Sequence, residues 1–181
     1  MNALLSPERL PAPSGSSGSA VLPDTRGKPP RVVLDTSVVV TALMFGGGPA
    51  ARLRSAWQTG LCRPMACKAT ALDLGAQLAH PHLGLTANEQ QTLLGDYLPY
   101  VLKVRVPQAD QPDARDEPAA LNYVRLAMAG RAHALVSGDA PMLGLEPRFP
   151  FAVLALDAFI KALDAVDITP IPKPSRYGLT Y

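Results

Sequence analysis

Short apolar, β-branched segments alternate with segments of helical periodicity along most of this chain, from residue 31 to about residue 165. The segments expected to form strands are 31–35, 61–67, 101–106, 134–137 and 151–154. Such short apolar runs, bounded by turn residues, are typical of strands buried on both faces of a sheet. Alternation of strands with helices predicts an α/β fold, here a three-layer α/β/α sandwich around a central, mainly parallel sheet.

The expected helices lie between these strands, at 37–43, 50–59, 68–79, 86–100, 119–129 and 157–165. The run Gly46–Pro49 separates the first two helices, and Thr86–Glu89 matches a capping box that begins the fourth. The helix over 119–129 is expected to end with Gly130 as its C-cap residue. Three apolar residues of that helix share one face, which is expected to point to the core: Leu121, Val124 and Met128.

The two ends of the chain have a different composition from its middle. Residues 1–30 are rich in Pro, Gly and Ser, and residues 169–181 contain several Pro residues. Segments of this kind bury too little apolar surface to offset the entropy lost on ordering. We therefore expect a disordered N-terminal tail over 1–30, one folded domain over 31–168 and a C-terminal tail over 169–181.

Charge and cysteine content narrow the function classes. The net charge of +2 is mildly basic, which permits a nucleic-acid partner without requiring one. The two cysteines, Cys62 and Cys67, are too few for a disulfide framework or a zinc site, so reduced thiols are expected. The longest apolar run, 32–45, is interrupted by Asp35 and is shorter than the roughly 20 residues of a membrane span. We expect a cytoplasmic protein with no membrane partner.

Two acidic residues follow expected strands of the sheet. Asp35 ends the first strand, and Asp139 lies just after the strand over 134–137. Ligands of open α/β sheets bind beyond the carboxyl ends of the strands. Two carboxylates on neighbouring strands repel each other, and a hard divalent cation removes that repulsion. The alternatives remain that Asp35 is a helix N-cap and that Asp139 is a turn residue.

Two short motifs resemble those of a known family. The first strand continues as Val32-Val-Leu-Asp-Thr-Ser37, and the later strand as Leu135-Val-Ser-Gly-Asp139. They resemble the opening strand of PIN domains, which ends in Asp-Thr-Asn, and their later Val-Thr-Gly-Asp element. Residues 127–132 are similar to the small-residue helix end before that element, so the resemblance covers about residues 31–160. It implies a PIN-like fold and a metal-dependent ribonuclease. The spacing from Asp35 to Gly46–Pro49 and Leu53 is also similar to that of a bacterial PIN subgroup known as toxins of toxin–antitoxin pairs.

The resemblance implies a second acid in the helix over 68–79. Family members usually have Glu eight residues before the Pro of a Leu-x-x-Pro ending, and Asp73 has that spacing to Pro81. Asp is one methylene shorter than Glu, so Asp73 would act on a metal through a bridging water. The alternative is an ordinary solvated Asp on a helix face.

The third acid of the family belongs at the start of the helix before residue 127. A gapless count from Asp139 places Ala120 there, and Ala cannot bind a metal. If the helix is about one turn longer, Asp116 takes the role, with Asp113 and Glu117 as the other candidates. The alternative is a solvated loop with a capping acid.

The remaining site residues are supporting ones. The resemblance implies that Thr36 and Ser37 orient the first acid and a water, and that Ser137, in place of the usual Thr, forms similar hydrogen bonds. Basic side chains that could hold an RNA backbone, or be ordinary surface charges, are Arg52, Arg54, Arg63, Lys68 and Arg115.

The leading hypothesis is a metal-dependent endoribonuclease with Asp35, Asp73, Asp116 and Asp139 as its catalytic acids. Mg²⁺ or Mn²⁺ would be held by Asp35, Asp116 and Asp139. Its expected partners are an RNA substrate, an antitoxin protein if the chain is a toxin, and a second copy in a homodimer. The alternative is a catalytically degenerate PIN fold that binds RNA or protein, and a generic metal- or nucleotide-binding α/β module is a third hypothesis.

Overall fold

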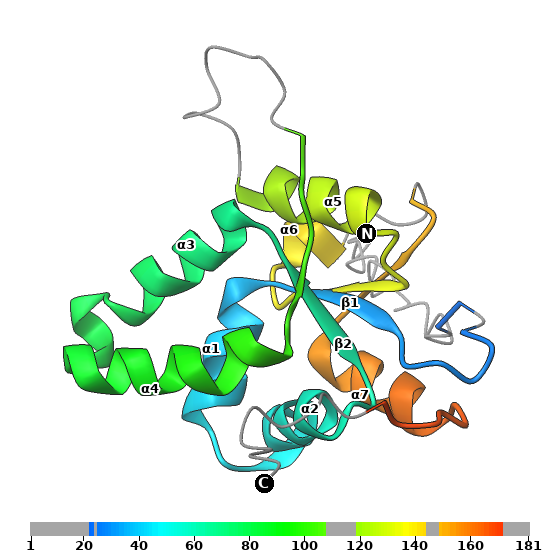
Figure 1. Ribbon diagram of the computed structural model, residues 1–181, viewed down its shortest axis with the longest axis horizontal. Coiled ribbons are helices and arrows are strands. Elements are labelled where there is room, and N and C mark those ends of the chain that lie inside the picture. The colour runs from blue at the N-terminus through cyan, green and yellow to red at the C-terminus, as the bar shows by residue number, and fades with distance from the viewer. Residues whose placement is uncertain (1–21, 24, 108–118, 144–148, 172–181) are drawn as a thin grey trace, which may run out of the picture.

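A five-stranded parallel sheet forms the centre of the computed structural model, which describes residues 22–23, 25–107, 119–143 and 149–171 (Figure 1). The strands are β1 (Arg31–Leu34), β2 (Arg63–Ala66), β3 (Leu102–Lys103), β4 (Ala134–Val136) and β5 (Ala152–Leu154). Their order across the sheet is β3-β2-β1-β4-β5, and each pairing is parallel. The predicted α/β class and parallel sheet are confirmed.

Helices cover both faces of this sheet (Figure 1). They are α1 (Thr36–Met44), α2 (Gly48–Thr59), α3 (Lys68–Leu78), α4 (Ala87–Tyr97), α5 (Ala119–Gly130), α6 (Ala140–Leu143) and α7 (Leu156–Asp164). Two 3₁₀ turns, Pro81–Leu83 and Leu98–Tyr100, flank α4. The turn over Leu98–Tyr100 falls within the helix expected over 86–100, whereas the turn over Pro81–Leu83 and α6 were not expected, because single turns show no hydrophobic periodicity.

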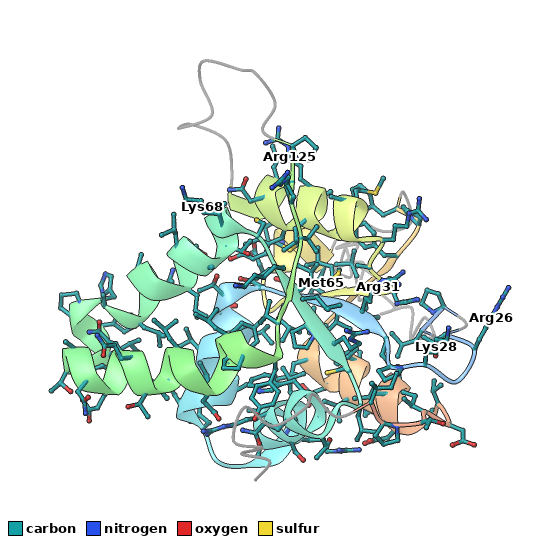
Figure 2. The ribbon with its side chains drawn as sticks, viewed as in Figure 1. Arg26, Lys28, Arg31, Met65, Lys68 and Arg125 are labelled. Carbon is teal, nitrogen blue, oxygen red and sulfur yellow. The ribbon has the colours of Figure 1, made fainter. Side chains whose placement is uncertain are left out.

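One face of the sheet packs against α5 and α6 through a cluster that includes Val33, Met65, Leu126 and Leu135. Met65 lies on β2 (Figure 2), and its sulfur comes against the backbone of Gly130 at the end of α5. This close contact is possible because glycine has no side chain.

The expected core face of α5 is wrong. Leu121 is 39% exposed and Met128 is 50% exposed, whereas Tyr123, Leu126 and Ala127 are buried. Apolar residues stand on both sides of this helix, so periodicity alone does not select the buried side.

The end of α5 also differs from the expectation. Gly130 is the last residue of the helix, and the left-handed conformation belongs to Arg131, at φ 49°.

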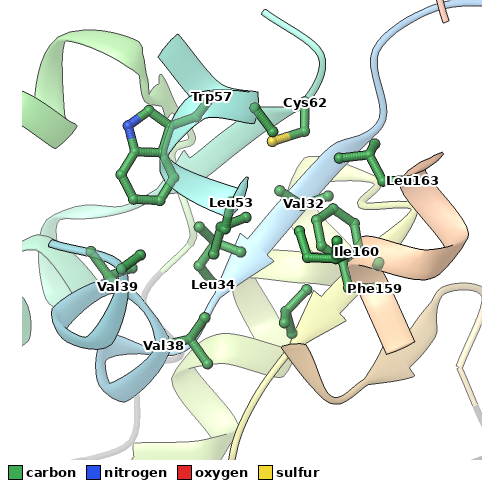
Figure 3. Close-up of a cluster of buried hydrophobic side chains, with 14 of the residues drawn as sticks. Val32, Leu34, Val38, Val39, Leu53, Trp57, Cys62, Phe159, Ile160 and Leu163 are labelled. Carbon is green, nitrogen blue, oxygen red and sulfur yellow. The ribbon is translucent and has the colours of Figure 1, made fainter. Parts of the chain in front are cut away.

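The other face of the sheet is covered by α1, α2 and α7, whose apolar side chains join those of Val32 and Leu34 (Figure 3). Trp57 and Phe159 are the largest fully buried side chains of this layer. Val33 packs on the opposite face because successive side chains of a strand alternate. Because β1 is buried on both faces, packing holds its carboxyl end in place. Asp35 directly follows Leu34, so its backbone position is held as well.

Packing extends beyond the expected limits of the domain. Leu22 is 5% exposed and belongs to the cluster on the α1 side. The Thr169 N–H donates to the Gly27 carbonyl at 3.0 Å, and the Ile171 N–H to the Gly60 carbonyl at 3.2 Å. The described part of the expected N-terminal tail therefore belongs to the folded unit. In the part of the chain that the structure describes, no helix is long and apolar enough to cross a membrane.

Candidate functional site

Asp35 stands at the carboxyl end of β1, where the chain turns into α1. One of its carboxylate oxygens, Oδ1, accepts the Ser37 N–H at 3.2 Å and so caps the helix. The other, Oδ2, accepts the Ser137 hydroxyl at 2.7 Å. Ser137 follows β4, which pairs with β1 in register, so the two side chains meet across adjacent strands. Asp35 is thus the N-cap that the alternative interpretation required, and it also faces the neighbouring strand end.

Asp139 is tied to the same serine. Its backbone N–H donates to the Ser137 Oγ at 3.0 Å, and its side chain is exposed just before α6. Ser137 is fully buried, and its hydroxyl accepts from Asp139 while donating to Asp35. One side chain therefore links the carboxylate of Asp35 to the backbone of Asp139.

Asp73 comes from α3 and reaches the first turn of α1. Its Oδ2 accepts the Thr36 hydroxyl at 2.5 Å and the Tyr123 hydroxyl at 2.7 Å. Thr36 directly follows Asp35 and is buried. Asp73 is consequently a half-buried, hydrogen-bonded carboxylate rather than a solvated residue of a helix face.

Tyr123 on α5 was not among the residues selected from the sequence. Besides donating to Asp73, its hydroxyl oxygen accepts the Thr36 N–H at 3.3 Å and lies very close to the Thr36 hydroxyl. Burial, followed by the nearby Asp73 carboxylate, raises the pKa of Tyr123 well above its usual value. The side chain is therefore a neutral donor. The only signal in the sequence was its place three residues after Ala120, on the helix expected to carry the third acid.

The acids do not all converge. Within the described ranges, no group of three or more His, Cys, Asp or Glu side chains could share a metal ion. Asp35 and Asp139 are linked through the Ser137 hydroxyl, whereas Asp73 is hydrogen-bonded to Thr36, the residue that follows Asp35 in the chain. The three candidates for the remaining acid, Asp113, Asp116 and Glu117, lie outside the described residues.

Residues 31–140 match the model of the PIN domain family, which is more than half of the chain. The chain belongs to the PIN domain family. PIN domains are generally nucleases that use divalent metal ions. A solved structure with a similar fold is that of PAE2754 from Pyrobaculum aerophilum. It is 15% identical, with a TM-score of 0.47, and the match covers 78% of this chain and 95% of that one. None of the curated proteins matches this chain.

The carboxylate oxygens in this PIN domain are the type of ligand that a hard divalent cation prefers. Asp35 and Asp139 offer carboxylate oxygens at the ends of adjacent strands, and Ser137 binds the carboxylate of the first and the backbone N–H of the second. Mg²⁺ is commonly held by one or two carboxylates while it keeps several waters. The two acids could hold such an ion, with Asp73 acting through one of the waters.

The basic residues expected to hold RNA are only partly suited to it. Arg52 pairs with Asp164 at 2.5 Å, and Arg54 with Asp96 at 2.5 Å. Both belong to α2, which Figure 1 shows well away from the start of α5. Arg63 begins β2 and so lies at the opposite, amino end of the strands.

Lys68 is the expected basic residue best placed for a substrate. It is the first residue of α3, beyond the carboxyl end of β2, and it is exposed (Figure 2). Arg115 lies outside the described residues.

Proposed function

We propose that this PIN domain is a metal-dependent endoribonuclease that hydrolyses RNA phosphodiester bonds with Mg²⁺ or Mn²⁺. The observation that carries the proposal is the shared Ser137 hydroxyl, which joins Asp35 and Asp139 at the carboxyl ends of β1 and β4. The buried Ser137 hydroxyl orients the Asp35 carboxylate and anchors the backbone at Asp139. This supports a site in which the ligands are held in place by a neighbouring hydrogen-bonding group.

Asp35 and Asp139 are the proposed direct ligands, and Asp116 is the proposed third one. A cation held there would lower the pKa of a coordinated water and would offset the negative charge of the phosphate oxygens. Asp35 is oriented by the Ser37 N–H and by Ser137, so its carboxylate is already in place before a metal binds. Asp73 orients water at the side of the site nearest to Thr36.

Lys68 is the proposed contact for the RNA backbone among the described residues, and Arg115 is proposed with it. An ammonium group at the start of α3 is close in sequence to Asp73 and stands on the carboxyl side of the sheet. Its contribution would be electrostatic and independent of RNA sequence.

A degenerate PIN fold, which binds RNA or protein without cleaving it, is the second candidate. It is favoured by the lack of a three-acid group within the described residues and by Asp73 in place of the usual Glu. An assay of metal-dependent cleavage distinguishes the two candidate functions, because only the nuclease requires Asp35 and Asp139 as carboxylates.

The toxin role, an antitoxin partner, a homodimer and a cytoplasmic location are further proposals that rest on the family. Leu72, Leu121 and Met128 are exposed apolar side chains that a protein partner could cover. Growth of cells expressing the protein tests the toxin role. We expect arrest with the wild type and normal growth with Asp35→Asn, and normal growth in both would contradict it.

The test of the nuclease is cleavage of a mixed RNA pool with Mn²⁺, for the wild type, Asp35→Asn and Asp139→Asn. The matched control is Asp164→Asn, which alters an exposed carboxylate of α7 that pairs with Arg52. We expect activity in the wild type and the control only. Equal activity in all four proteins, or none in the wild type, would contradict the proposal.

A further inference from the structure

The helix whose start is expected to supply a third acid also supplies a phenol at the site. A gapless count from Asp139 places Ala120 at the position that the family motif gives to the acid, and Tyr123 follows one turn later on α5. Residues three apart on a helix lie on neighbouring parts of its surface. Tyr123 is 4% exposed, so its ring is part of the core while its hydroxyl reaches the polar site.

That hydroxyl joins three helices. It donates to Asp73 on α3 at 2.7 Å and accepts the first N–H of α1, from Thr36, at 3.3 Å. The first N–H groups of a helix have no partner within it, so Tyr123 satisfies a donor that would otherwise be buried without one. The Thr36 hydroxyl donates to the same Asp73 oxygen at 2.5 Å. Two donors from two elements therefore fix one carboxylate oxygen.

The short side chain of Asp73 makes the two hydroxyl groups important for its position. Because Asp is one methylene shorter than Glu, its carboxylate extends less far from α3 toward the strand ends. A short acid has less freedom to adjust, so its position depends on the groups that hold it. Burial keeps the Tyr123 hydroxyl protonated, which suits it to holding a carboxylate and not to acting as a base.

We propose that Tyr123 is a positioning residue, which together with Thr36 holds the Asp73 carboxylate against the first turn of α1, so that it can orient water bound to a metal at the Asp35–Asp139 pair. This inference rests on the proposed metal-dependent nuclease and deepens it. It assigns to α5 a neutral hydroxyl in addition to whatever carboxylate the preceding segment contributes.

The first test uses metal-free protein and needs no activity. Urea unfolding is measured for the wild type, Tyr123→Phe, Asp73→Ala and the double variant. If the hydroxyl holds Asp73, the two substitutions are coupled, by about fivefold or more in the unfolding equilibrium constant. Additive effects would overturn the proposal, whether or not the protein is a nuclease.

The second test measures Mn²⁺ affinity from the electron paramagnetic resonance signal of free Mn²⁺. Tyr123→Phe should weaken binding by about tenfold, as expected when a group that orients metal ligands or their water is lost. The control is Tyr97→Phe, which alters a buried tyrosine packed against Trp57 in the other cluster and should leave the affinity unchanged.

The outcomes of these two tests distinguish the positioning role of Tyr123 from the metal-dependent nuclease function. Coupling between Tyr123 and Asp73 with equal Mn²⁺ affinity in the wild type and Tyr123→Phe would overturn the positioning role, because the tyrosine would then only stabilise the fold. A wild type that binds no Mn²⁺ at millimolar concentration would contradict the metal-dependent nuclease itself, and the positioning role with it. Coupling together with a selective loss of affinity supports both.

Discussion

Ser137 donates its hydroxyl hydrogen to Asp35 across the β1–β4 pair, at 2.7 Å, although the two residues are 102 positions apart in sequence. The same oxygen accepts the Asp139 N–H. Ser137→Ala should therefore lower Mn²⁺-dependent cleavage by roughly 10- to 100-fold, because the Asp35 carboxylate loses a group that orients it and the backbone at Asp139 loses its anchor. It should also reduce the free energy of unfolding by about 1–3 kcal/mol, since the Asp139 N–H loses its acceptor.

The control for that prediction is Ser137→Thr, which keeps the hydroxyl and is the residue usual in PIN domains. It should retain most of the activity. Cleavage rates and thermal unfolding of both variants provide the measurement. Full activity in Ser137→Ala would mean that Asp35 and Asp139 do not need the shared hydroxyl.

Gly130 is a position where one methyl group should destabilise the protein. A Cβ there would lie 2.7 Å from the Met65 sulfur and 3.3 Å from the Val104 Cγ2. Overpacking of this kind costs about 1–3 kcal/mol, whereas replacing Gly by Ala in a helix gains up to about 1 kcal/mol. The crowding should win because Met65 is itself buried, so Gly130→Ala should lower the free energy of unfolding by about 1 kcal/mol.

The effect of Gly130→Ala on the free energy of unfolding should change sign when Met65 is shortened. In a Met65→Ala background the two closest contacts are removed and the Val104 contact remains, so Gly130→Ala should become stabilising. Urea unfolding of the four proteins measures both effects. The same sign in both backgrounds would show that the close contact with Met65 does not determine the effect.

His133 should make stability depend on pH. Its Nδ1 accepts the Arg31 N–H at 2.9 Å, which only the unprotonated nitrogen can do. Burial, and then the Arg31 charge, lower the pKa of His133 from its ordinary value of 6.5. The unfolded state consequently binds more protons in the window just below pH 6.5. The stabilisation is complete above that pH and is lost as the pH falls through the lowered pKa.

The comparison is with His133→Asn, whose carbonyl oxygen can accept the same N–H and does not titrate. Melting temperatures between pH 7.5 and pH 5 should fall less in this variant than in the wild type. Parallel curves for the two proteins would contradict the role assigned to His133.

The two thiols should differ in reactivity. Burial raises the pKa of the Cys62 thiol to about 12, and this side chain is 1% exposed. Cys67 is half-buried and lines a groove of about 570 Å³ together with Lys68 and Leu98. A thiol reagent such as DTNB should label one thiol in the native protein and both in urea, and Cys67→Ser should abolish the native reaction. Rapid native labelling of Cys67→Ser would contradict this.

The fold and the two strand-end acids could be predicted because both depend on local patterns. Val32 to Leu34 form a run that only a buried strand explains, and the end of that run places Asp35. Ser137 and Asp139 follow from the same reasoning at β4.

Tyr123 could not be predicted in this way. Its partner Asp73 is 50 residues away, and the contact depends on how α3 and α5 approach each other. The apolar pattern of α5 was misleading as well, because Leu121 and Met128 are exposed while Tyr123 is buried. A helix with apolar residues all round leaves its orientation to tertiary packing.

The most direct test of the account is the chemistry of the RNA ends produced by the wild type and by Asp35→Asn, with Mn²⁺ and with EDTA. Attack by a metal-activated water leaves no cyclic phosphate, whereas a contaminating metal-independent ribonuclease that uses the 2′-hydroxyl does. We predict fragments without cyclic ends, formed only by the wild type and only with Mn²⁺. Cleavage that survives EDTA or Asp35→Asn, or that leaves cyclic phosphates, would contradict a metal centre at Asp35.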